Sequence, residues 1–312
     1  MKKRESILGM SGKEMLMARY KDKLHQFLMG DGKIRGALVH GTHLVKEMRE
    51  YHELGILETF ILGHGYLAAS LMTANFKGIE RVAIKIDCSG PVGGISLEAN
   101  GYGEVRGYLK NKHIPLDKPL ERFDMAPFLG NGLLTVIRYI PDAKTPYEGR
   151  VHLQNGSIAR DLAFYYSTSE QTPTVFNLSV IFDKEGNVTG AGGLFLQAMP
   201  GAEDEQIGQL EAIVEQLPSI GEYFAANGDA EDFIRRQFQD LSPRILGQRR
   251  IEFFCRCQKE SFGRILGNLE LDSLKDLAEN GPFPLETRCN YCNSVYTFSQ
   301  EELQEMYKKR LN

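Results

Sequence analysis

The chain contains the stretches FFCRCQKESF, residues 253–262, and ETRCNYCNSV, residues 286–295, which hold four of its five cysteines. One residue separates Cys255 from Cys257, and two residues separate Cys289 from Cys292. Residues 258–288 lie between the two pairs. In a chain that is not secreted, close cysteine pairs favour metal binding or redox chemistry over a structural disulfide framework. The spacing therefore predicts a metal site that oxidation can open.

Four cysteine thiolates satisfy the tetrahedral coordination of Zn²⁺. All seven histidines lie at or before His152, so none is expected as a local ligand. The second pair lies in RCNYCNSVYTF, residues 288–298, a pattern typical of a zinc knuckle flanked by short strands. An iron–sulfur cluster also takes four cysteines and is an alternative. We expect one Zn²⁺ in the reduced protein, bound by Cys255, Cys257, Cys289 and Cys292.

The segment that holds both pairs, residues 255–312, is small. A unit of this size buries little apolar surface and usually needs a metal or disulfides to fold. Zinc binding contributes about 10–16 kcal/mol in small modules, against a total stability of about 5–15 kcal/mol for a whole domain. Oxidants attack thiolates, and after oxidation the nearest disulfide partner of each cysteine along the chain is the other cysteine of its own pair. Such tiny disulfide loops contribute little stability, so we expect oxidation to unfold the segment.

Composition indicates a globular protein without a preference for polyanions. The chain has 42% hydrophobic and 25% charged residues and a net charge of −4, so we expect neither nucleic acid nor a membrane as a partner. Lys2, Lys3 and Arg4 begin like a signal peptide, but Glu5 and later charges interrupt the apolar stretch that secretion requires. No run approaches the roughly 18 apolar residues of a membrane span. We expect a cytoplasmic protein, in which thiols stay reduced.

Charge and pattern divide the chain into three segments. Residues 201–254 hold eleven acidic and five basic residues, whereas residues 1–200 and 255–312 carry net charges of +3 and −1. The expected fold class is α+β. It comprises an N-terminal mixed α/β-sheet domain over residues 1–200, an acidic helical linker over 201–254, and a small C-terminal domain with both cysteine pairs over 255–312.

Alternating apolar residues and glycine-rich turns predict strands in the first segment. They are expected at residues 34–40, 80–90, 93–101, 104–110 and 130–140, with a hairpin over 174–199 that turns at 184–187. Helical spacing of apolar residues predicts helices at 43–55, 66–78 and 156–171. In the last segment, one helix is expected after Ser261, and a capping box of Ser299 and Glu302 predicts the start of another.

The acidic segment contains two apolar stripes at helical spacing. Short helices of this kind are marginal alone and depend on what they pack against. If the zinc-binding segment stabilises them, its unfolding loosens them, and their apolar side chains can then bind the exposed apolar surface of an unfolding protein, a client. The alternative is a plain interdomain connector. The candidate client-binding surface consists of Ile207, Leu210, Val214, Leu217, Phe233 and Phe238.

The cysteine spacing and several other stretches are similar to those of a known family. A Cys-x-Cys pair, about thirty residues and a Cys-x-x-Cys pair near the C-terminus resemble the heat shock protein 33 family of redox-regulated holdase chaperones, the 33 kDa chaperonins. The resemblance covers essentially the whole chain. It extends to GEVRGYL (103–109), GNGLLTV (130–136), YYSTSEQTPT (165–174) and GGLFLQAMPGA (192–202).

The resemblance implies ATP-independent binding of unfolding proteins under oxidative stress. It implies that the four cysteines hold Zn²⁺ in an inactive reduced form, and that oxidation forms Cys255–Cys257 and Cys289–Cys292 disulfides, releases zinc and unfolds the linker. It also implies that residues 201–254 form a metastable helical linker and residues 255–312 a zinc-binding redox-switch domain. The N-terminal domain would carry chaperone and dimerisation functions, with a homodimer on activation. Cys88 lies outside this motif, and we expect it to be a small buried hydrophobe.

Three other interpretations are weaker. Gly63-x-Gly65-x-x-Ala68, with Asp87 nineteen residues further on, superficially fits a dinucleotide fingerprint, but the antiparallel meander that follows disfavours a dehydrogenase. A zinc-stabilised nucleic-acid-binding module would need a basic face, which the nearly neutral residues 255–312 lack. A purely structural zinc site is the third. No nucleophile, base and orienting group stand out together, so we expect no enzymatic activity; the tyrosines and Glu170 of YYSTSEQ are expected to pack and cap a helix end.

Overall fold

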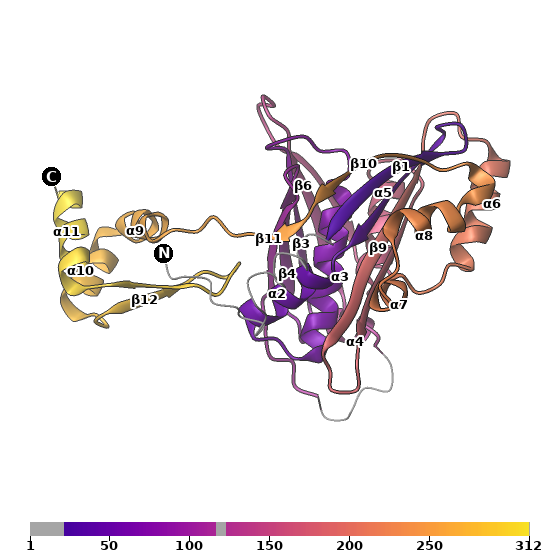
Figure 1. Ribbon diagram of the computed structural model, residues 1–312. Coiled ribbons are helices and arrows are strands. Elements are labelled where there is room, and N and C mark those ends of the chain that lie inside the picture. The colour runs from indigo at the N-terminus through magenta and orange to yellow at the C-terminus, as the bar shows by residue number, and fades with distance from the viewer. Residues whose placement is uncertain (1–21, 117–122, 312) are drawn as a thin grey trace. The chain divides into compact units, whose positions relative to one another are not determined.

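A computed structural model describes residues 22–116 and 123–311 (Figure 1). The chain divides into two units, Met1–Phe254 and Cys255–Asn312. The N-terminal stretch considered above as a signal peptide lies outside the described residues. Both units mix helices and strands, as the α+β prediction requires.

Two sheets form the first unit. The five-stranded sheet has the order β10-β1-β2-β9-β8, and the six-stranded sheet has the order β11-β5-β4-β3-β6-β7. The predicted meander is confirmed, because β3–β4 and β4–β5 pair antiparallel, and so is the 174–199 hairpin. The strands are β1 Lys23–Met29, β2 Ile34–His40, β3 Arg81–Cys88, β4 Gly94–Asn100, β5 Glu104–Leu109, β6 Gly132–Tyr139, β7 Tyr147–His152, β8 Thr174–Phe182, β9 Val188–Ala198, β10 Arg244–Arg250 and β11 Glu252–Phe253.

A central helix, α3 (Ile56–Met72), lies between the two sheets and contacts strands of both (Figure 1). Fifteen of its seventeen residues are buried, so it is apolar all round and lacks the one-sided pattern of a surface helix. It begins ten residues before the predicted helix at 66–78. A Cβ on Gly65 would lie 2.8 Å from Leu97 of β4, so this glycine permits close packing of helix and strand. The GxGxxA stretch is therefore internal to a helix and forms no phosphate-binding loop.

The remaining helices of residues 22–200 are short. They are α2 Thr42–His52, α4 Ala126–Leu129 and α5 Ile158–Thr168. Tyr165 of α5 donates a hydrogen bond to Glu170 at 2.7 Å, which fits the expected packing and capping role. The pKa of the Tyr165 hydroxyl is raised, mainly by burial. Cys88, at the end of β3, is only partly buried, and burial raises the pKa of its thiol.

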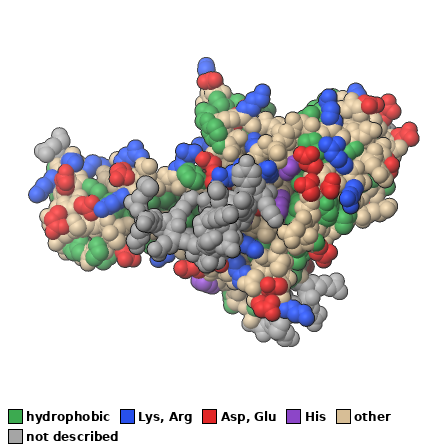
Figure 2. Space-filling view, in the orientation of Figure 1, with side chains coloured by type: hydrophobic (Ala, Val, Ile, Leu, Met, Phe, Trp, Pro, Cys, Tyr) green, Lys and Arg blue, Asp and Glu red, His purple; other side chains and the backbone are tan. Residues whose placement is uncertain are grey.

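The acidic segment packs on the outer face of the five-stranded sheet. Its helices are α6 Asp204–Glu215, α7 Ile220–Ala225 and α8 Ala230–Gln237, followed by the 3-10 helix η1 Gln239–Leu241. Their apolar side chains form one buried cluster with Phe27, Met29, Ile34 and Leu38 of β1 and β2 and with Leu194 and Leu196 of β9. Their outer surface is charged (Figure 2), with Glu231–Arg235 and Asp232–Arg236 pairs along α8.

Residues 244–253 differ from the helical expectation, because they form strands. β10 pairs antiparallel with β1 as the edge of the five-stranded sheet, and β11 pairs in parallel with β5 in the other sheet. Alternation is present in RILGQRR, where Ile245 is half-buried between exposed neighbours, but charges and a glycine weaken the signal. The end of the acidic segment is thus part of both sheets of the first unit.

The second unit contains three helices and a hairpin within its described residues 255–311. These are α9 Lys259–Gly267, α10 Leu271–Asn280, β12 Leu285–Arg288, β13 Val295–Phe298 and α11 Gln300–Leu311. The predicted capping box is confirmed: Ser299 N donates to Glu302 Oε2 at 2.9 Å, and Glu302 N donates to Ser299 Oγ at 3.3 Å. The short strands expected on either side of the Cys-x-x-Cys stretch are also present. The α10 helix was not predicted.

Candidate metal centre

The Cys-x-x-Cys pair forms a tight turn between β12 and β13. Cys289 N donates to Ser294 O at 2.9 Å, and Asn293 N donates to Cys289 O at 2.8 Å. Asn293 has a φ of 61°, a left-handed conformation that asparagine tolerates better than most residues. The turn therefore follows from local sequence, and it directs both sulfurs to the same side.

The Cys-x-Cys pair lies on an irregular segment between β11 and α9, held by a contact with the hairpin. The hydroxyl of Tyr296, on β13, donates to Cys257 O at 3.0 Å and lies 3.2 Å from Cys257 Sγ. Lys259, two residues on, pairs with Glu302 of α11 at 2.6 Å. These two contacts bring the first cysteine pair onto the second.

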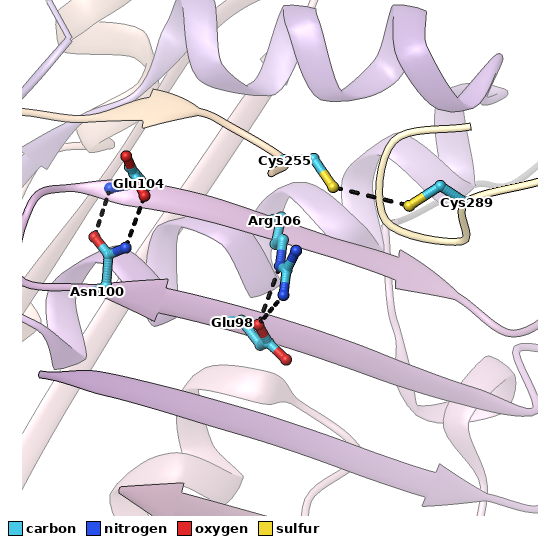
Figure 3. A network of polar contacts seen from close by, with 6 residues as sticks. All are labelled: Glu98, Asn100, Glu104, Arg106, Cys255 and Cys289. Atoms are coloured by element: carbon cyan, nitrogen blue, oxygen red, sulfur yellow. Dashed lines mark hydrogen bonds and ion pairs between the residues drawn. The ribbon is translucent and has the colours of Figure 1, made fainter. Parts of the chain in front are cut away.

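The four Sγ atoms lie within 4.8 Å of one another, so they can hold a metal ion. The recorded contacts run between the pairs: Cys255 Sγ lies 3.8 Å from Cys289 Sγ, and Cys257 Sγ lies 3.2 Å from Cys292 Sγ (Figure 3 draws the first). A tetrahedral site with Zn–S bonds of about 2.3 Å has sulfur–sulfur edges of about 3.8 Å. The donor set and its spacing therefore fit Zn²⁺, and all-sulfur donors do not suit Mg²⁺ or Ca²⁺.

Contacts and burial within the cluster shift the pKa values of Cys257 and Cys292 in opposite directions. Hydrogen bonds from Cys255 and Cys289 lower the pKa of the Cys292 thiol, and Ser294 adds to this effect. Burial raises the pKa of the Cys257 thiol to about 11, from 9.0. Cys289 and Cys292 are each 5% exposed, whereas Cys255 and Cys257 are half-buried. A bound cation would favour the thiolate form of all four cysteines, because it compensates their negative charge.

The core around the centre is small. Residues 255–311 bury only six hydrophobic side chains, and two of these six belong to cysteines. Phe262 and Tyr296 add an aromatic contact at 5.1 Å, half-buried at the edge of the cluster. The six are Leu274, Ala278, Cys289, Cys292, Phe298 and Leu303. A core of this size supports the expectation that the unit needs a further contribution to stay folded.

The candidate client-binding residues lie in the first unit. Leu210, Phe233 and Phe238 are buried in the cluster on the five-stranded sheet, and Val214 and Leu217 are partly buried against it. Ile207 is half-buried. Their packing partner is thus the sheet of their own unit.

Two polar residues that sequence patterns did not indicate, the half-buried Arg249 and the buried Asp22, hold the end of the acidic segment. Arg249 of β10 donates hydrogen bonds to Phe76 O at 3.2 Å, Gly101 O at 3.0 Å and both oxygens of Thr73. Burial lowers the pKa of Arg249 to about 10. Asp22 O accepts from Ile251 N at 3.1 Å. A lone arginine in a polar strand gives no sign that its partners are carbonyl groups on distant turns.

Comparison with known proteins places the chain among its relatives. The family model described as Hsp33 protein matches residues 22–299. The chain belongs to the Hsp33 family. The matched range includes the acidic segment, all four clustered cysteines and the β12–β13 hairpin, so it spans both units.

The Hsp33 relatives match over nearly their whole length. The chain is 32% identical over 290 residues to a 33 kDa chaperonin of Halalkalibacterium halodurans, covering 92% of this chain and 99% of the relative. It is 33% identical over 281 residues to a 33 kDa chaperonin of Acetivibrio thermocellus, with 89% and 94% covered. The crystal structure of a 33 kDa chaperonin, an Hsp33 homologue from Thermotoga maritima, superposes with a TM-score of 0.85 at 32% identity, covering 93% and 99% of the two chains.

Among the described residues, none of the helices has the length and apolar character needed to cross a bilayer.

Proposed function

We propose that this protein is a redox-regulated, ATP-independent chaperone that binds unfolding proteins and prevents their aggregation under oxidative stress. It acts by binding and not as an enzyme. The names of its Hsp33 relatives support a chaperone. The observation that carries the regulation is the cluster of four cysteine sulfurs in a unit whose described residues bury only six hydrophobic side chains.

In the reduced form, Cys255, Cys257, Cys289 and Cys292 hold one Zn²⁺, which links the Cys-x-Cys segment to the hairpin. The bound ion supplies four metal–sulfur bonds in place of a larger apolar core. The reduced form is inactive, because the apolar side chains of α6 and α8 are packed on the five-stranded sheet.

Oxidation by a peroxide converts the four thiolates into two disulfides. One thiolate attacks a peroxide oxygen, the O–O bond breaks, and hydroxide leaves; the second thiolate then attacks the sulfenic sulfur and displaces another hydroxide. Each disulfide consumes one peroxide and two protons and yields two water molecules. The disulfides are Cys255–Cys257 and Cys289–Cys292, and neither sulfur pair keeps a thiolate to bind Zn²⁺. The second unit then loses its link between segments and unfolds.

The unfolded second unit loosens the acidic segment through the chain that joins them. Phe253, the last residue of β11, is two residues before Cys255. β11 has only two residues paired with β5, and β10 is the edge strand of its sheet. Loss of β10 takes away Ile245, which packs against the cluster beneath α6–α8, and so loosens the docking of these helices and exposes Leu210, Phe233 and Phe238 for clients. The active form is a homodimer in the cytoplasm, as the family resemblance implies.

The test compares reduced, zinc-loaded protein with protein treated with peroxide. Zinc release, free thiols and light scattering of a heat-unfolding client are followed in the same samples. The expected result is loss of four thiols and one Zn²⁺ together with suppression of client aggregation, all reversed by dithiothreitol. If the reduced and oxidised forms suppressed client aggregation equally, redox regulation would be refuted and the zinc site would be purely structural. Salt-dependent retention of DNA or RNA would instead favour a nucleic-acid-binding module.

A further inference from the structure

We propose that Tyr296 slows the oxidation of Cys257 by hydrogen-bonding to its sulfur. This inference rests on the four-cysteine site of the proposed function and adds a residue that controls its reactivity. The Tyr296 hydroxyl donates to Cys257 O at 3.0 Å and lies 3.2 Å from Cys257 Sγ, so its single proton is shared between these two acceptors when the sulfur is a thiolate. One side chain thus contacts both the backbone and the reactive atom of the same cysteine.

The position of this hydroxyl is fixed by contacts at the other end of the side chain. The ring of Tyr296 packs on Phe262 of α9 at 5.1 Å between ring centroids. The backbone carbonyl of Tyr296 accepts a hydrogen bond from Thr287 Oγ1 of β12 at 3.2 Å. The hydroxyl is therefore held at Cys257 by the hairpin and by the aromatic contact, and a phenylalanine in its place keeps both of these anchors.

The sulfur of Cys257 is more accessible to peroxide than the sulfurs of Cys289 and Cys292. Cys289 and Cys292 are each 5% exposed and are shielded by the turn that carries them. Cys257, in contrast, is half-buried on an irregular segment, so a small peroxide has access to it. A hydrogen bond to the sulfur protects the accessible atom chemically where burial does not protect it sterically.

The chemistry gives the direction of the effect. In the first step a lone pair on Cys257 Sγ attacks a peroxide oxygen; an S–O bond forms, the O–O bond breaks, and hydroxide leaves and takes up a proton. Negative charge leaves the sulfur during this step, so a hydrogen bond donated to the thiolate is stronger before the attack than during it. An interaction that is stronger in the ground state than in the transition state raises the barrier. Removal of the hydroxyl should therefore accelerate attack at Cys257.

The test uses the full-length, reduced and zinc-loaded protein with Tyr296→Phe, and Tyr307→Phe as the matched control. Tyr307 lies in the same unit, and its side chain packs on the Ala278–Phe298–Leu303 cluster. Peroxide-driven zinc release is followed with a chromogenic chelator, and the sulfenic acid at Cys257 is trapped with a cyclic dione and quantified by mass spectrometry. We expect Tyr296→Phe to raise both rates by about tenfold, which corresponds to loss of about 1.4 kcal/mol of ground-state stabilisation, the order of one hydrogen bond to a charged group. Tyr307→Phe should match the wild type.

Two results would overturn the inference. One is an unchanged rate of peroxide-driven zinc release in Tyr296→Phe. The other is an equal increase in zinc transfer to the chelator without peroxide, because this would assign the effect to weaker metal binding. Client aggregation is measured in parallel on the wild type. If the oxidised wild type fails to protect the client while Tyr296→Phe still oxidises faster, the proposed function fails and the role of Tyr296 stands.

Discussion

Replacement of Arg249 by methionine should undock the acidic segment without oxidation. The Arg249 guanidinium, on the last strand of that segment, donates to carbonyl oxygens of Thr73, Phe76 and Gly101 and to Thr73 Oγ1. These acceptors lie just after α3 and in the turn between β4 and β5. One side chain therefore joins β10 both to the end of the central helix and to the six-stranded sheet. Methionine keeps much of the apolar stem of the side chain and removes all four donated hydrogen bonds.

The expected cost follows from the hydrogen bonds that the substitution removes. A hydrogen bond from a charged donor contributes about 1.5–3 kcal/mol, but burial of the guanidinium offsets part of the sum of four. Each buried acceptor left without its donor costs about 1–3 kcal/mol, and the substitution leaves the carbonyl oxygens of Thr73, Phe76 and Gly101 unpaired, so we take about 3–5 kcal/mol as the expected loss. At about 1.4 kcal/mol per factor of ten, the undocked population rises between about 150-fold and about 4,000-fold.

Two measurements on the reduced, zinc-loaded protein test this expectation. Hydrogen–deuterium exchange should accelerate in peptides covering residues 204–250 while peptides from α3 stay protected, and the variant should suppress client aggregation without peroxide. Arg250→Met is the matched control, because the adjacent Arg250 is exposed and pairs with Glu252 at 2.8 Å. Such a surface change is expected to stay within about 0.5 kcal/mol of the wild type.

The reasoning about Arg249 is refuted if exchange in α6–α8 and client protection both match the wild type. Faster exchange throughout the first unit, including α3, would also refute it, because the arginine would then support the whole unit and not the docking of one segment.

The remaining predictions concern pH, packing and the metal. Burial raises the pKa of Asp22 to about 7 from 3.8, so its contribution to stability is full below about pH 4 and is lost as the pH rises through 7. Urea unfolding should show the wild type losing up to about 4 kcal/mol relative to Asp22→Asn between pH 4 and pH 8; a constant difference contradicts this. Phe233→Ala should cost about 3–5 kcal/mol, because Phe233 is fully buried, whereas Phe283→Ala, at a position 41% exposed, should be nearly neutral. Cys289→Ser should abolish zinc binding and the circular dichroism of the second unit's helices, and Cys88→Ser should preserve both; retained helicity in metal-free Cys289→Ser would contradict the dependence on zinc.

Much of the local structure was predictable because its signals are local. The short strands β12 and β13, the capping box at Ser299 and the 174–199 hairpin each depend on residues close together in the chain, and all three are confirmed. The α3 helix was predicted too short because its first half is apolar without one-sided periodicity. β10 was missed because it is an edge strand of polar composition. The arginines and glycine of RILGQRR hide the alternation of exposed and half-buried side chains that would indicate a strand.

The sequence by itself determined the elements of the candidate site: four thiols in two close pairs, on a segment too small for a large core. Only the tertiary structure decided which surfaces these elements serve. It brings the four sulfurs within 4.8 Å, sets the Tyr296 hydroxyl against Cys257, and packs the apolar stripes of the acidic segment on β1, β2 and β9. The physical reason is range. Spacing and capping act over a few residues, whereas the partner of a buried side chain depends on which distant strands and turns the whole fold brings beside it.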